Sequence, residues 1–129
     1  MGAFHGICVR LLRQDCHSVG VPRNFVIYDE DDRRGLIKKA MKKMSISDTD
    51  IKPTAVSSAI SSAKNALQDP DEYEAQAHYP FQQAVAKIYR VYEERRKEAK
   101  ALDFDDLLIE TVRMLRERQD VRDKWRAQF

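Results

Sequence analysis

The chain has 129 residues, 43% of them apolar and 34% charged, a balance that is typical of one soluble globular domain and not of a disordered chain. Its formal net charge of +2 is too small to indicate a nucleic-acid-binding protein, so the distribution of charge matters more than the sum. No apolar run approaches the roughly 20 residues of a membrane span, and no signal-peptide pattern opens the chain. We therefore expect an intracellular protein without a membrane partner.

The first half of the chain predicts three helices and one short extended run. Apolar residues recur with helical spacing over residues 4–19, whereas residues 24–28 are β-prone but too few to build a sheet. Asp29 suits an N-cap and Asp32 occupies the third helical position, so a second helix is expected to begin there. Pro53 suits the first turn of a third helix.

The second half also predicts helices. A short helix is expected over residues 72–77, the longest helix begins at Pro80, and another is capped by Asp103 with Asp106 three residues on. A last segment, 121–129, has bulky apolar residues at four-residue spacing. The expected fold is all-α, a single helical domain of about five to seven helices with no substantial sheet. The predicted core contains Leu36, Ile37, Met41, Ile60, Phe81, Val85, Ile88 and Leu108.

Four residues of the types that bind zinc lie near the N-terminus: His5, Cys8, Cys16 and His17. His5 and Cys8 are one helical turn apart, but the other two lie about 12 to 18 Å further along the same expected helix, too far for one tetrahedral centre. The same separation argues against a disulfide between the two cysteines. Nothing near Cys8 supplies an oxyanion hole, so we expect neither a metal site nor a nucleophilic pair.

The acidic residues Asp103, Asp105 and Asp106 could serve a metal or a general acid, but acids in the first turn of a helix mainly complement the positive end of its dipole. The structural interpretation is preferred. A phosphate-binding loop is excluded more firmly, because no glycine begins a loop that ends in Gly-Lys-Ser or Gly-Lys-Thr. The chain as given is therefore not expected to bind ATP through such a loop.

Four motifs occur in an order that resembles UvrD/Rep/PcrA-like superfamily 1 DNA helicases. Phe-His-Gly at 4–6 leads into Ile-Cys-Val-Arg-Leu-Leu-Arg at 7–13, and Asn-Phe-Val-Ile-Tyr-Asp follows at 24–29. Ile-Ser-Ser-Ala-Lys-Asn stands at 60–65, and Leu-Asp-Phe-Asp-Asp-Leu-Leu at 102–108. Each motif is weak alone, but the ordered set is specific and covers essentially the whole chain.

The resemblance implies the mostly helical 1B subdomain of such an enzyme, with residues 1–20 and 102–129 adjoining its 1A motor core. The parent enzyme would move 3′ to 5′ along single-stranded DNA with ATP and Mg²⁺ bound outside this segment, so the segment itself holds no cofactor and is expected to be inactive. Implied partners are single-stranded and duplex DNA, without sequence preference, and the 1A, 2A and 2B subdomains. The implied location is the cytoplasm, at the nucleoid.

Candidate DNA contacts follow from the same resemblance and from a basic stripe. Six of the eleven residues from 33 to 43 are Lys or Arg, and such side chains neutralise phosphates without reading sequence. His5, in the strand-contacting motif, is the best candidate. Weaker candidates are Phe4, Arg10, Arg13, Lys38, Lys42 and Lys64. Ala3 stands where the family usually has Thr, which removes a hydroxyl that would contact phosphate.

A helical protein-interaction module without DNA binding is the competing interpretation. Serines 57, 58, 61 and 62 would give the third helix a small, smooth face, and an exposed Tyr79 or Trp125 could dock a partner helix. Salt-dependent DNA binding separates the two hypotheses, because only a phosphate-binding module loses affinity steeply with salt.

Overall fold

The computed structural model describes residues 2–15, 24–117, 123 and 126–127. Within these residues the chain forms six helices and two three-residue strands, which confirms the all-α prediction. The elements are α1 (Gly2–Asp15), β1 (Val26–Tyr28), α2 (Glu30–Lys43), α3 (Pro53–Asn65), α4 (Pro70–Ala75), α5 (Pro80–Glu98), β2 (Ala101–Asp103) and α6 (Phe104–Glu117). The cysteine and histidine at 16 and 17 and most of the predicted last segment lie outside the described residues.

Helices begin where the local sequence satisfies their first backbone N–H groups. The Asp29 side chain accepts from the backbone N–H of Asp32, and Asp32 accepts in return from the backbone N–H of Asp29, so the predicted capping box of α2 is confirmed. Pro53 and Pro80 occupy the first positions of α3 and α5, where a missing N–H costs nothing. Asp69 and Glu72 form a second capping box that opens α4.

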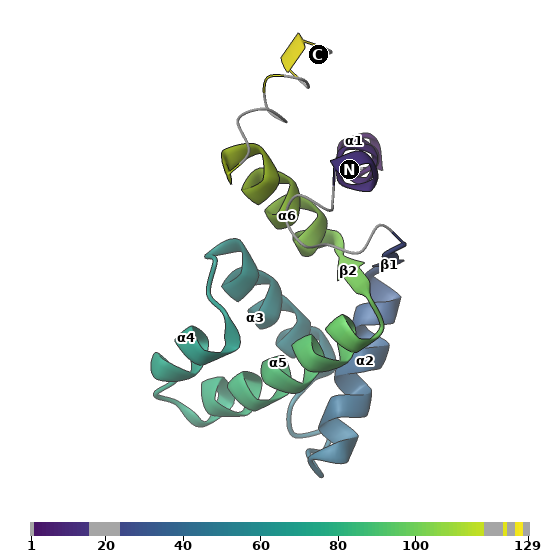
Figure 1. Ribbon diagram of the computed structural model, residues 1–129. Coiled ribbons are helices and arrows are strands. Elements are labelled where there is room, and N and C mark those ends of the chain that lie inside the picture. Colours follow the sequence, from purple (N-terminus) through teal and green to yellow (C-terminus); the bar gives the residue numbers. More distant parts are fainter. Residues whose placement is uncertain (1, 16–23, 118–122, 124–125, 128–129) are drawn as a thin grey trace.

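The two strands pair in parallel, with Val26 opposite Ala101 and Tyr28 opposite Asp103. The run at 24–28 therefore does enter a small sheet, which corrects the expectation that it was too brief to do so. Its partner lies more than seventy residues later in the chain, where no local pattern reveals it. In Figure 1 the strands lie between a group that contains α1 and α6 and a group that contains α2, α3, α4 and α5.

The apolar core falls into two clusters that share no residue. The α1–α6 cluster consists of Cys8, Leu11, Leu12, Phe25, Leu102, Leu107 and Met114. The α2–α3–α5 cluster consists of Ile37, Ala40, Met41, Val56, Ile60, Ala63, Val85, Ile88, Tyr89 and Tyr92. The helix pairs that contact one another agree with this division, since α1 packs on α6 while α2 packs on α3 and α5.

Five of the eight predicted core residues are buried: Ile37, Met41, Ile60, Val85 and Ile88. Leu36 and Leu108 are half-buried. Phe81 was wrongly predicted to be buried, because 41% of it is exposed. Phe81 lies in the first turn of α5. Helix α5 packs against α4, but α4 is short and none of its own residues is buried.

No helix among the described residues combines the length and the apolar character needed to cross a membrane.

Candidate nucleic-acid interface

Helix α1 carries the first group of predicted DNA contacts. Phe4 and His5 lie in its first turns, but their side chains are not among those that the structure describes. Arg10 and Arg13 are exposed. The Arg13 guanidinium donates to the carbonyl of Phe25 at 3.3 Å and lies 4.4 Å from the centre of the Phe25 ring, so it joins α1 to the segment before β1.

Helix α2 carries the second group. Lys38 and Lys42 are exposed and border a shallow pocket of about 320 Å³, whose lining includes Met41 and Ile46. With their neighbours Lys39 and Lys43, which are also exposed, they form the basic face of α2. These four lysines are the part of the predicted stripe that stays available to a phosphate backbone.

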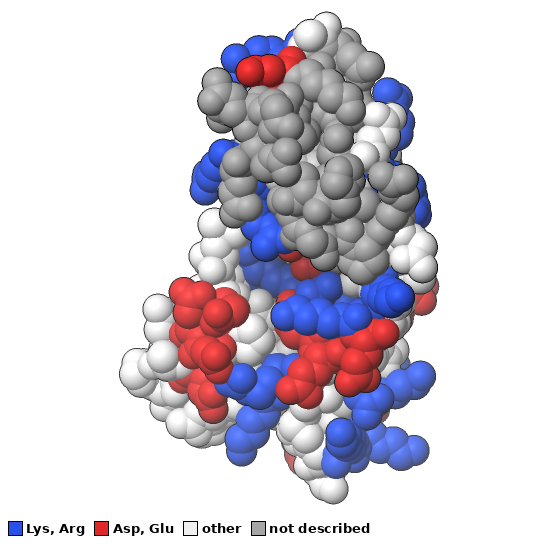
Figure 2. Space-filling view, viewed as in Figure 1, with Lys and Arg blue, Asp and Glu red and all other residues white. Residues whose placement is uncertain are grey.

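The stripe is shorter than predicted, because its first two members form ion pairs within the chain. Arg33 is buried, and its guanidinium lies 2.5 Å from a carboxylate oxygen of Asp105. Arg34 pairs with Asp31 on the same helix. On the face shown in Figure 2, lysines and arginines form several separate groups, with acidic groups between them.

Lys64 is the clearest correction among the predicted contacts. Only 4% of the residue is exposed, and its ammonium lies 2.8 Å from Asp103, 3.0 Å from Asp106 and 3.0 Å from Glu93. Burial alone would lower its pKa, but the three carboxylates outweigh burial and raise it, so the side chain stays charged. A lysine held in this way is not available to DNA phosphate, so the prediction that Lys64 contacts DNA is wrong.

The carboxylates around Lys64 belong to the corner where β2 meets α6. Asp103 and Asp106 cap α6 reciprocally, with backbone-to-carboxylate distances of 2.8 and 3.1 Å. The second oxygen of Asp103 accepts from Lys64 and, at 2.6 Å, from the hydroxyl of Tyr92. The acidic motif therefore has the structural role expected of it, and the sequence did not reveal the cations that face it.

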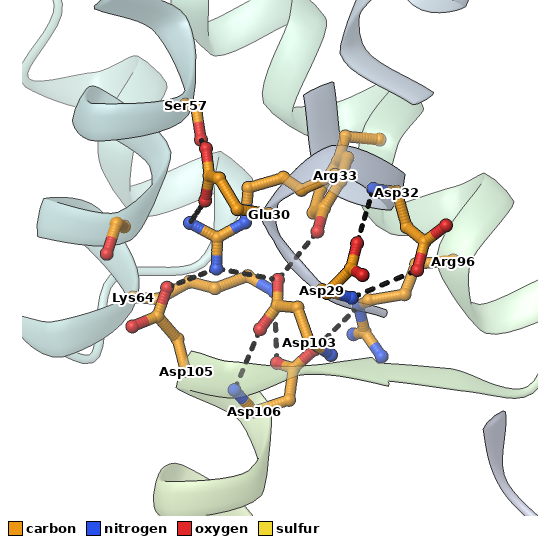
Figure 3. A network of polar contacts seen from close by, with 12 residues as sticks. Asp29, Glu30, Asp32, Arg33, Ser57, Lys64, Arg96, Asp103, Asp105 and Asp106 are labelled. Atoms are coloured by element: carbon orange, nitrogen blue, oxygen red, sulfur yellow. Dashed lines mark hydrogen bonds and ion pairs between the residues drawn. The ribbon is translucent and has the colours of Figure 1, made fainter. Parts of the chain in front are cut away.

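Arg96 closes the network from α5. Its guanidinium lies 2.7 Å from Glu93 and 3.0 Å from Asp106, and it donates to the carbonyl of Ala101 at 2.8 Å. We call the whole set the buried ion network (Figure 3). Its members are Arg33, Lys64, Glu93, Arg96, Asp103, Asp105 and Asp106, with the hydroxyl of Tyr92.

The buried ion network so defined has four carboxylates and three cations, and the exposed carboxylate of Glu30 adds a longer ion pair with Arg33 at 3.9 Å. Burial would raise the pKa of Asp103, but Lys64 and Arg33 outweigh burial and hold that pKa below its usual range. For Asp106 burial prevails: together with the charges of Asp103 and Glu93 it raises the pKa to about 7, although Lys64 and Arg96 oppose the shift. A proton therefore neutralises Asp106 at a higher pH than it neutralises Asp103.

The sequence does contain a signal for these buried cations. Each lies four residues from a fully buried core residue on its own helix: Arg33 precedes Ile37, Lys64 follows Ile60 and Arg96 follows Tyr92. Side chains four residues apart share a helix face, so all three cations extend an apolar stripe. A charge on such a stripe, together with an acidic cluster elsewhere, indicates a buried ion pair.

Among the residues that the structure describes, no group of three or more His, Cys, Asp or Glu side chains could hold a metal ion. Cys8 is buried in the α1–α6 cluster. What these residues do offer is a basic face on α2, two arginines on α1, and a buried polar junction between the two clusters.

Comparison with known proteins identifies the family of this chain. The UvrD/REP helicase N-terminal domain matches residues 1–129. The chain belongs to this family. In this member of the UvrD/REP family, the motif at 102–108 contributes Leu102 and Leu107 to the α1–α6 cluster. It also contributes three carboxylates to the buried ion network.

Three bacterial relatives have the name ATP-dependent DNA helicase PcrA. The Staphylococcus epidermidis protein is 37% identical over 114 residues, which are 88% of this chain and 16% of the relative. The Leuconostoc citreum protein is 32% identical over all 129 residues, 17% of its length, and that of Staphylococcus aureus strain Mu50 is 34% identical over the same span, 18% of its length. The chain thus spans less than a fifth of these curated relatives.

Proposed function

We propose that the chain is the helical 1B subdomain, with residues 1–20 and 102–129 adjoining the 1A motor core, of a 3′-to-5′ ATP-dependent DNA helicase. The proposal rests mainly on the alignment of proteins named ATP-dependent DNA helicase over 88% to 100% of the chain. The motif order and the exposed basic face of α2 support it. The parent enzyme would bind ATP and Mg²⁺ outside this segment and act at the nucleoid in the cytoplasm.

In this proposal the segment holds DNA and does not hydrolyse nucleotide. His5 and Phe4 at the start of α1, Arg10 on its exposed face, and Lys38 and Lys42 on α2 contact the sugar-phosphate backbone. Backbone contacts position a protein on DNA without reading its bases, so binding is independent of sequence. Arg13 belongs to the same surface, although its guanidinium also contacts Phe25.

A salt titration of DNA binding tests the proposal. Binding of the 129-residue chain to fluorescent oligothymidine is measured by anisotropy at several salt concentrations. The dissociation constant is expected in the non-specific range of about 10⁻⁴ to 10⁻⁶ M and rises steeply with salt. Replacing Lys38 and Lys42 by alanine lowers the salt slope by about 1.4, because each contact with a single-strand phosphate contributes about 0.7. His5→Ala also weakens binding.

The matched control replaces Lys87 and Lys97, two exposed lysines of α5, and removes the same charge from another surface. An equal loss of slope in the control would assign the effect to net charge alone. Binding that does not depend on salt, or that none of these substitutions changes, would favour the protein-interaction module. Tyr79, 69% exposed at the start of α5, would then be the first docking residue to replace.

A further inference from the structure

The two apolar clusters touch through a polar junction. They share no core residue, and the chain passes from one to the other at Asp29, before α2, and again between α5 and β2. The buried ion network lies at this junction, where α2, α3 and α5 meet the β2–α6 corner (Figure 3). Cations from α2, α3 and α5 therefore meet carboxylates of the β2–α6 corner across this boundary.

Charged hydrogen bonds differ from apolar contacts in what they specify. Apolar burial has no preferred direction, so orientations of two apolar surfaces that bury the same area have similar free energies. Hydrogen bonds between ionised groups require short distances and aligned donors, and they become stronger inside a protein. A network of such bonds therefore selects one orientation among several with similar apolar contact.

Lys64 is the member that joins the most elements. From α3 its ammonium reaches Glu93 on α5, Asp103 on β2 and Asp106 on α6, at 2.8 to 3.0 Å. Glu93 lies on the same side of the junction as Lys64, whereas Asp103 and Asp106 lie on the opposite side. No apolar side chain could replace these three directed contacts.

Stability alone does not account for the network. Bringing charges out of water is costly, and well-packed apolar residues in place of a buried ion pair are often as stable or more stable. Five members of the network, Arg33, Lys64, Arg96, Asp103 and Asp106, have at most 8% of their side chains exposed. The desolvation of so many charges is accounted for if their role is to specify geometry.

We propose that Lys64 is a positioning residue that fixes the α2–α3–α5 cluster at one orientation relative to the α1–α6 cluster. The orientation goes beyond the proposed function, because it can be measured without DNA. Its consequence rests on that function: the basic face of α2 and the start of α1 lie on different clusters, so a fixed orientation lets both contact one strand at the same time.

Distance distributions between the two clusters test the proposal. A keto-bearing amino acid at Lys39 on α2 and at Arg116 on α6, both exposed, takes a spin label without disturbing the native cysteines. Pulsed electron paramagnetic resonance on the doubly labelled 129-residue chain then gives the distribution of distances between the two spin labels. The unsubstituted junction is expected to give one narrow distribution.

The main variant carries Lys64→Met and Asp106→Asn together, which removes one cationic and one acidic side chain. We expect it to remain helical and to give a broader distribution with a shifted mean. Asp106→Asn alone keeps Lys64 and is expected to broaden the distribution less, so the test does not depend on the stability of the double variant. A distribution as narrow as that of the parent in both variants, even with a lower melting temperature, would overturn the proposal.

Arg90→Met is the control. Arg90 pairs with Asp71 and Glu74 of α4. The substitution therefore removes two ion pairs that lie entirely on one side of the junction. It is expected to leave the distribution narrow, and equal broadening here would contradict a specific role for Lys64. In a separate arm, the double variant is expected to bind oligothymidine more weakly. If a variant with a broader distance distribution binds DNA as well as the unsubstituted chain does, the orientation is not needed for DNA binding. If the unsubstituted chain does not bind DNA, the proposed function alone is refuted.

Discussion

At the scale of single residues, Asp106 has the least balanced surroundings in the buried ion network. It faces Lys64 from α3, Arg96 and Glu93 from α5, and Asp103 from β2. Burial, with the two neighbouring acids, raises its pKa to about 7 in the folded protein from 3.8, the ordinary value. The folded state thus binds a proton more tightly than the unfolded state, and this proton affects stability between those two values.

The sign of the effect on stability is definite. Between about pH 4 and pH 7 the folded chain holds more protons at Asp106 than the unfolded chain, so the free energy of unfolding falls as the pH rises through this window. The largest possible contribution is about 4 kcal/mol, at 1.36 kcal/mol for each pKa unit. Asp103 and Glu93 have lowered pKa values, and their contributions are lost only at more acidic pH.

Asp106→Asn removes this titration. Urea unfolding followed by circular dichroism at pH 5.0, 6.0 and 7.5 is expected to show a smaller fall in the free energy of unfolding for the variant than for the unsubstituted chain. The two proteins differ at this one position, so contributions from the rest of the chain cancel in the comparison. The same fall in both proteins would show that Asp106 is already ionised at pH 5.

A second prediction at this scale contrasts two apolar residues of α5. Ile88 has no exposed surface, whereas Phe81 is 41% exposed. Ile88→Ala should lower the free energy of unfolding by about 2 to 5 kcal/mol, because it removes buried methyl groups and leaves a cavity. Phe81→Ala should cost less than about 1 kcal/mol, as expected for a residue outside the core. Equal costs in urea unfolding would contradict the packing of α5.

At the scale of elements, three helices are followed by residues in the left-handed region. Ser45, Leu67 and Lys100 have φ angles of 58°, 58° and 55°. After α3 the backbone N–H groups of Leu67 and Gln68 donate to the carbonyls of Lys64 and Ala63 at 2.9 Å, the pattern of a Schellman motif. Glycine is the residue that suits the Leu67 position best, because a side chain there is strained.

Leu67→Gly is therefore expected to stabilise the chain. Removing the left-handed strain of a non-glycine residue gains about 1 kcal/mol, and Leu67 is 63% exposed, so little apolar burial is lost. Greater freedom of glycine in the unfolded chain offsets part of the gain. Ala55→Gly, at an exposed position inside α3, is the control and should cost about 1 kcal/mol. A lower midpoint of urea unfolding for Leu67→Gly would contradict the prediction.

Elements were predictable from the sequence to the extent that their signals are local. The capping box at Asp29 and the prolines at 53 and 80 gave the starts of three helices, because backbone N–H groups are satisfied within one turn. The pairing of β1 with β2 was not predictable, since it joins segments that are distant in sequence. The contacts of Lys64 were missed for the same reason: its carboxylate partners on β2 and α6 lie about 40 positions later.

At the scale of the whole molecule, family membership and the two-cluster core both agree with a chain whose two parts have different surroundings in the parent enzyme. In the proposed function the two clusters have different neighbours in the parent enzyme, with residues 1–20 and 102–129 adjoining the motor core. The absence of shared core residues between the clusters is compatible with such a division. The motif at 102–108 serves both sides, because Leu102 and Leu107 pack in one cluster while its aspartates bind cations from the other.

The last prediction concerns catalysis by the chain itself. Glycines occur only at positions 2, 6, 20 and 35, and none of them begins the Gly-rich loop whose backbone N–H groups, lysine and hydroxyl hold a nucleotide and its magnesium ion. Phosphoryl transfer depends on such positioning and charge stabilisation. The purified chain should therefore release no phosphate from ATP above the buffer rate, with or without single-stranded DNA. Turnover that survives repurification and is lost in a heat-denatured sample would contradict the assignment of this segment to DNA contact alone.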